Sequence, residues 1–89
     1  MKTISIKVTG KVQGVFFRES TKEQATALGV AGTVCNLPDG GVEIICTGTP
    51  EQLESLINWC RQGPPKAKVT DVQWKENGLQ SFNGFTVIR

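Results

Sequence analysis

Histidine is absent from this chain of 89 residues. Its absence removes Ser–His and Cys–His nucleophile pairs, a phosphohistidine intermediate and any imidazole base. The three cysteines, Cys35, Cys46 and Cys60, are widely spaced, odd in number and without the CxxC spacing of a zinc site. The arginine that a cysteine phosphatase loop needs six residues after its cysteine is also missing, because Gly41 stands there. We therefore expect free thiols, no metal and no cofactor.

Long apolar runs are also lacking, and none approaches the roughly 20 residues that a membrane-spanning helix needs. The N-terminal residues move straight into alternating sequence and contain no apolar signal-peptide core. With 38% hydrophobic and 20% charged residues, the composition is typical of a soluble globular protein. We expect one domain over residues 1–89, a monomer, located in the cytoplasm.

The net charge of +2 comes from scattered basic residues. This charge is too mild to indicate a nucleic-acid partner, and nothing in the sequence indicates a membrane partner. It is compatible with a small anionic substrate.

The first half of the chain has a strand pattern followed by a helix pattern. Apolar and polar residues alternate from Ile4 to Val12, which predicts a strand with one buried face. Ser20 and Glu23 have the spacing of a capping box at a helix start, and Gly29 is typical of a helix end. The helix face that we expect to be buried carries Thr21, Ala25 and Leu28.

The second half predicts strands over residues 30–37 and 42–47, joined by a turn at residues 38–41. Thr49, Pro50 and Gln52 then have the pattern of a capped helix start with proline at its first position. The apolar stripe of this helix, at helical spacing, carries Leu53, Leu56, Ile57 and Cys60. Further strands are predicted over residues 67–75, with a bulge near Thr70 and Asp71, and over residues 82–88.

The element order is therefore β-α-β-β-α-β with a short C-terminal strand. This order predicts an α+β, ferredoxin-like two-layer α/β sandwich. Both right-handed βαβ units place their helices on the same face, so an antiparallel sheet covered on one face by two helices is expected.

The segment from Gly10 to Arg18 is the strongest candidate for a functional loop, because it lies between a strand and a helix. Gly14 permits a tight turn whose successive N–H groups can point into one concavity that suits an anion. The following helix adds its N-terminal amides, and Arg18 adds a planar, permanently charged fork for phosphate oxygens. An ordinary strand-to-helix turn followed by a solvated arginine remains the alternative.

Two motifs resemble the signatures of the acylphosphatase family. The first is Val8-x-Gly10-x-Val12-Gln13-Gly14-Val15-x-Phe17-Arg18, and the second is Gly29-Val30-x-Gly32-x-Val34-x-Asn36-x-x-Asp39-Gly40-x-Val42-Glu43. Gly63-Pro64-Pro65-x-Ala67-x-Val69 and Phe85-x-x-Ile88 match as well. The resemblance spans the chain from end to end and implies the ferredoxin-like fold that the element order predicts independently.

This resemblance implies metal-independent hydrolysis of acyl phosphates to a carboxylate and inorganic phosphate. It makes Arg18 the phosphate-binding arginine and Asn36 the residue that positions the attacking water. The backbone amides of Gly14, Val15, Phe16, Phe17 and Arg18 would hold the substrate's phosphate, inorganic phosphate or another anion. From its sequence position alone, Asn36 before a Pro-Asp-Gly turn is more often a turn residue that bonds its own backbone.

The chain departs from the family pattern at two positions that flank Asn36. Thr33 stands where an aromatic residue is common, and Cys35 stands where a basic residue is common. Neighbours in a strand point to opposite faces, so we expect these changes to affect packing, local potential and substrate preference rather than the chemistry.

Two alternative functions use the same fold. An RNA-recognition domain would display aromatic residues on its central strands in a defined pattern, which Phe16 and Phe17 do not supply. A degenerate acylphosphatase-like domain, as found within larger maturation proteins that use carbamoyl phosphate, would bind an anion without turnover. The presence of both Arg18 and Asn36 favours an enzyme over this second alternative.

Overall fold

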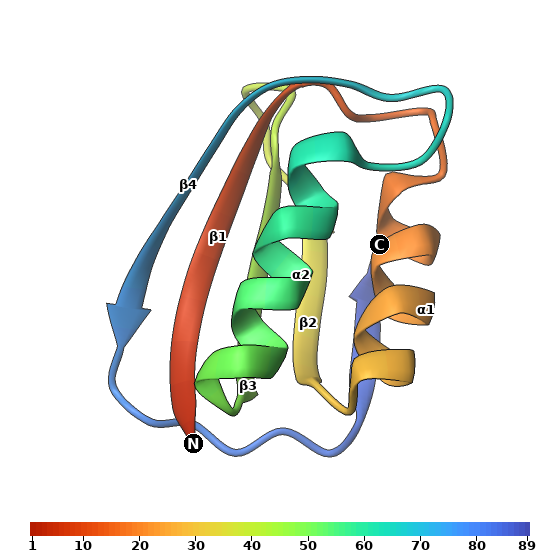
Figure 1. Cartoon of the computed structure of the whole chain (residues 1–89). Helices are drawn as coiled ribbons and strands as arrows, with labels where there is room; N and C mark the ends of the chain where they lie inside the picture. The colour runs from red at the N-terminus through yellow and green to blue at the C-terminus, as the bar shows by residue number, and fades with distance from the viewer.

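The computed structural model describes residues 1–89 and places both helices over one face of a five-stranded sheet (Figure 1). The order of strands across the sheet is β4-β1-β3-β2-β5. The elements are β1 (Lys2–Lys11), α1 (Phe17–Leu28), β2 (Ala31–Asn36), β3 (Val42–Gly48), α2 (Pro50–Gln62), β4 (Lys68–Asn77) and β5 (Phe85–Ile88). This architecture confirms the ferredoxin-like two-layer sandwich.

The antiparallel pairing predicted for the sheet holds for β4, β1, β3 and β2, whereas β5 pairs parallel with β2. After β4 the chain crosses the end of the sheet without a helix and enters the opposite edge (Figure 1). Because β4 ends at the end of the sheet where β2 begins, a chain that crosses there runs alongside β2 in the same direction. The sheet is therefore mixed.

A pair of buried threonines anchors this crossing segment. The hydroxyls of Thr3 and Thr47 lie 2.6 Å apart, and the Gln80 backbone N–H donates to Thr3 Oγ1 at 2.8 Å. Thr47 Oγ1 in turn donates to the Gln80 carbonyl at 2.7 Å. These bonds satisfy two hydroxyls that would otherwise be buried without partners, and they fix the route of the chain into β5.

The core lies between the helices and the sheet and contains 18 buried apolar residues. The predicted stripe of α2 is confirmed, because Leu53, Leu56, Ile57 and Cys60 are its buried residues. In α1 the buried residues include Thr21 and Ala25, while Leu28 is half-buried against the core. Neither helix has the length and hydropathy needed to cross a membrane.

The two helix starts differ in how well the sequence predicts them. The capping box of α2 is confirmed: Thr49 Oγ1 accepts from the Gln52 N–H, and Gln52 Oε1 accepts from the Thr49 N–H. The capping box predicted at Ser20 is wrong, because α1 begins at Phe17 and its N-cap residue, Phe16, makes no side-chain cap. Packing decides this start: the buried ring of Phe17 lies 5.5 Å from the ring of Trp59, which holds the first turn against α2.

The predicted bulge in β4 is also confirmed. Thr9 pairs with Asp71 and Gly10 pairs with Val69, so Thr70 is the extra residue. Gly10 has a φ of 126°, and a Cβ atom there would lie 2.2 Å from the Lys68 carbonyl oxygen. Glycine therefore lets the two strands stay in contact where β1 leaves the sheet and the candidate functional loop begins.

Candidate functional site

A cavity of about 300 Å³ lies at the N-terminal end of α1. It brings together Arg18 and Asn36, which come from different elements. The full lining is Val12, Gly14, Phe16, Phe17, Arg18, Glu19, Asn36 and Arg89. Of the site residues that the sequence indicates, only Val15, which is buried, is not part of the lining. Thr33 and Cys35 do not line the cavity either.

The backbone of the β1–α1 loop has the geometry of an anion-binding nest. Left-handed φ values of 74° at Gly14 and 63° at Phe16 alternate with negative φ at Val15 and Phe17. Such alternation turns successive N–H groups toward one concavity. Residues 14 to 16 lie outside the helices and strands, and their N–H groups donate no backbone hydrogen bond. The first-turn amides of α1 also have no partner within the helix.

Arg18 lies in the first turn of α1 with its guanidinium at the cavity. Nη1 donates to the Ile88 carbonyl oxygen at 3.0 Å, which links α1 to the end of β5. Guanidinium has five N–H donors, so this bond leaves most of the fork available to a ligand. Glu19 and Arg89, which form an ion pair, also line the cavity.

Asn36 is the last residue of β2 and is half-buried. Its side-chain amide forms no hydrogen bond with any other group of the chain. The residue that bonds the turn backbone is Asp39 instead, whose Oδ1 accepts from the Gly41 N–H at 2.9 Å. An amide that faces a cavity with its donor and acceptor both unused is suited to binding water.

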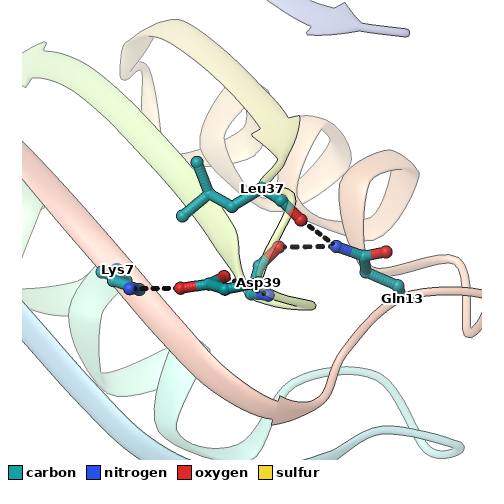
Figure 2. Close-up of polar contacts among 5 residues, drawn as sticks. Lys7, Gln13, Leu37 and Asp39 are labelled. Atoms are coloured by element: carbon teal, nitrogen blue, oxygen red, sulfur yellow. Dashed lines mark hydrogen bonds and ion pairs between the residues drawn. The ribbon is translucent and has the colours of Figure 1, made fainter.

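Gln13 is a site residue whose role was not predicted from the sequence. Its Nε2 donates to the Leu37 carbonyl at 2.8 Å and to the Gly41 carbonyl at 2.9 Å (Figure 2). Gln13 precedes the nest and Leu37 follows Asn36, so this side chain joins the two halves of the site. Gln13 lies within the first signature motif, but a contact with residues 24 and 28 positions away has no signal in local spacing.

Lys7 also stabilises the turn to which Gln13 is hydrogen-bonded. The Nζ atom of Lys7 lies 2.6 Å from Asp39 Oδ2 (Figure 2). The hydrogen bond from Lys7, followed by that from the Gly41 N–H, lowers the pKa of Asp39 below its ordinary value of 3.8. The carboxylate therefore stays ionised at neutral pH and keeps the turn in place beside Asn36.

Metal ligands do not gather anywhere in the chain, since no cluster of three or more His, Cys, Asp or Glu side chains is present. The arrangement is a ferredoxin-like sandwich in which the amides of the β1–α1 loop and an arginine of α1 meet at one cavity. It defines a class of small two-layer domains in which backbone amides and an arginine gather at one helix N-terminus, an arrangement that suits an anion.

The family model for acylphosphatases matches residues 4–87, and this chain belongs to the acylphosphatase family. The acylphosphatase of Methylococcus capsulatus is 43% identical over 90 residues, which cover 100% of this chain and 98% of the relative. Among solved structures, the acylphosphatase from Bacillus subtilis has a TM-score of 0.96 at 36% identity, with 100% of both chains covered. The acylphosphatase from Coxiella burnetii has a TM-score of 0.94 at 40% identity, with 98% of this chain and 92% of that chain covered.

Proposed function

We propose that Arg18, Asn36 and the backbone amides of residues 14 to 18 carry out metal-independent hydrolysis of acyl phosphates to a carboxylate and inorganic phosphate. Membership of the acylphosphatase family makes the chain a hydrolase acting on acid anhydrides. The observation that carries the residue roles is the single cavity of about 300 Å³ that Gly14, Arg18 and Asn36 share.

The nest and Arg18 would hold the equatorial oxygens of the phosphoryl group. Phosphoryl transfer passes through a loose transition state in which negative charge spreads over these oxygens, so catalysis depends on positioning and electrostatics. The unpaired amides of residues 14 to 16 and the free donors of the Arg18 fork supply that stabilisation without reorganisation.

Asn36 would place the attacking water in line with the bond that breaks. The water oxygen forms a bond to phosphorus, the bond from phosphorus to the acyl oxygen breaks, and its electron pair leaves on the carboxylate. A phosphate oxygen takes the proton of the water. Because a carboxylate is a good leaving group, no general acid is needed, which suits a chain without histidine.

The same reasoning separates anhydrides from phosphate monoesters. Alkoxides and phenoxides are poorer leaving groups than carboxylates, so monoesters depend more on the protonation or metal assistance that these residues do not offer. We therefore assign the cavity to acyl phosphates rather than to ordinary monoesters. We also propose that the chain acts as a single domain over residues 1–89, as a monomer and in the cytoplasm; one core shared by strands and helices supports the first of these.

The experiment that tests this function compares benzoyl phosphate with p-nitrophenyl phosphate, with EDTA present. The wild type should hydrolyse the anhydride rapidly and the monoester hardly at all, and Arg18→Ala should lose at least about 10²–10³ in kcat/KM. If the folded wild type binds phosphate and hydrolyses neither substrate, the chain is an anion-binding relative and the proposal is wrong. Activity that EDTA abolishes would contradict the metal-independent mechanism.

A further inference from the structure

Phe16 carries an aromatic ring that the core does not use. The residue is 73% exposed and is part of the cavity lining, together with Arg18 and Asn36. The neighbouring Phe17 is 2% exposed and packs against Trp59. Of two adjacent phenylalanines, therefore, one belongs to the core and the other is left in solvent beside the nest.

The backbone conformation does not explain a phenylalanine at this position. Phe16 has φ 63° and ψ 26°, and it is the only residue other than glycine with a positive φ. A bulky L-residue is strained in this region, whereas glycine or asparagine would adopt it readily. The nest requires the left-handed backbone at this position but does not require an aromatic side chain. We therefore look for a separate function of the ring.

The remaining lining of the cavity offers little apolar surface. The side chains of Val12 and Phe17 are buried, at 1% and 2% exposure. Three further lining residues, Arg18, Glu19 and Arg89, are charged. The exposed ring of Phe16 is therefore the apolar surface available to anything bound in the cavity.

The position of the ring relative to the nest indicates what it contacts. Because Phe16 contributes its own N–H to the nest, a phosphoryl group held there lies beside the residue that carries the ring. The acyl substituent is bonded to that phosphoryl group and must lie within the same cavity of about 300 Å³. Resting on the proposed function, we propose that Phe16 is the acyl-group contact, and that the enzyme favours acyl phosphates with an aromatic or extended apolar acyl group.

The test compares the ratio of kcat/KM for benzoyl phosphate to that for acetyl phosphate. Phe16→Asn removes the ring and keeps a residue that tolerates the left-handed backbone. The ratio should fall about threefold to tenfold, the size expected for one aromatic contact. Phe16→Trp, which restores a larger ring, should return the ratio to the wild-type value or above it.

Two controls distinguish an effect of the Phe16 ring from damage to the nest and from a general effect of removing an exposed aromatic residue. The inhibition constant of inorganic phosphate measures the nest directly, and that of benzoylphosphonate relative to acetylphosphonate measures the acyl contact without turnover. Trp74→Asn removes the other exposed aromatic ring, which is 53% exposed and lies outside this cavity. This variant should leave the ratio unchanged.

The outcomes are distinct. A ratio that stays within twofold of the wild type in Phe16→Asn, with both substrates hydrolysed, would overturn the acyl contact and leave the proposed function standing. A ratio that falls equally in Trp74→Asn would overturn it as well. A wild type that hydrolyses neither substrate overturns the proposed function and the acyl contact together.

Discussion

Arg18 donates to the Ile88 carbonyl, and in the proposed function it also binds the ligand held by the nest. Its planar fork can donate to Ile88 from one nitrogen, as observed at 3.0 Å, and to two phosphoryl oxygens from others. A lysine carries the same charge on a single nitrogen, so it cannot reproduce this geometry. In the proposed function, therefore, the guanidinium shape matters as much as its charge.

We expect Arg18→Lys to lose about 10²-fold or more in kcat/KM for benzoyl phosphate, because a point charge replaces a preorganised fork. Steady-state kinetics at constant ionic strength measures this. Lys22→Ala is the matched control, since it removes an exposed positive charge from the same helix outside the cavity. If the Arg18→Lys variant retained activity within about threefold of the wild type, Arg18 would act only as a charge.

Asn36 is expected to act on turnover rather than on substrate affinity. Its amide is free of hydrogen bonds in the chain, and the nest that would bind phosphate lies on another segment. Asn36→Ala should lower kcat about 10²-fold, the loss typical of a misplaced reactant, with a smaller change in KM. If KM rises by that factor while kcat is unchanged, Asn36 binds substrate and does not position water.

At the scale of elements, Gln13 joins the nest to the turn after β2 through two hydrogen bonds (Figure 2). Gln13→Leu keeps the volume of the side chain and removes both bonds, so the nest and Asn36 can drift apart. We expect kcat for benzoyl phosphate to fall at least about tenfold, and the free energy of unfolding to fall by about 1–3 kcal/mol.

A double-mutant cycle distinguishes positioning from simple destabilisation. If Gln13 acts by holding Asn36 against the nest, Gln13→Leu should cost far less kcat in the Asn36→Ala background than in the wild type. Thr49→Ala is the control for stability: it removes the α2 cap, at a cost of about 1 kcal/mol, and does not touch the cavity. Additive effects on kcat would contradict the positioning role.

Elements whose determinants are local could be predicted from the sequence, and those set by packing could not. The α2 start follows from Thr49 and Gln52, whose side chains bond backbone groups three residues away. The α1 start does not, because a ring packed on Trp59 determines it and the similar Ser20–Glu23 pattern is unused.

At the scale of the molecule, the site exists only because the sheet brings distant segments together. The nest follows β1, Asn36 ends β2, and Ile88 ends β5, which runs parallel to β2. The sequence motifs indicate the first two segments, and the resemblance gives them roles. The contact with Ile88 depends on the helix-free crossing held by Thr3 and Thr47, which has no local signal.

The reactivity of the three thiols measures whether the folded core excludes solvent. Cys46 and Cys60 are fully buried, and burial raises the pKa of each to about 12. Cys35 is half-buried on β2 and forms no disulfide. The thiolate is the form that reacts with disulfide reagents. At neutral pH we therefore expect one thiol per native chain to react quickly with Ellman's reagent, and all three to react in urea.

The raised pKa values of Cys46 and Cys60 also predict how the stability of the fold changes at alkaline pH. The unfolded thiols ionise near 9 and the folded ones near 12, so the unfolded state loses protons first. Stability is then complete below about pH 9 and decreases as the pH rises toward 12. The urea midpoint should be lower at pH 10.5 than at pH 8, and Cys46→Ala should show a smaller drop between these pH values. Fast labelling of three native thiols at neutral pH would show that the core admits solvent at these positions. A midpoint that rises with pH in this window would contradict the predicted direction.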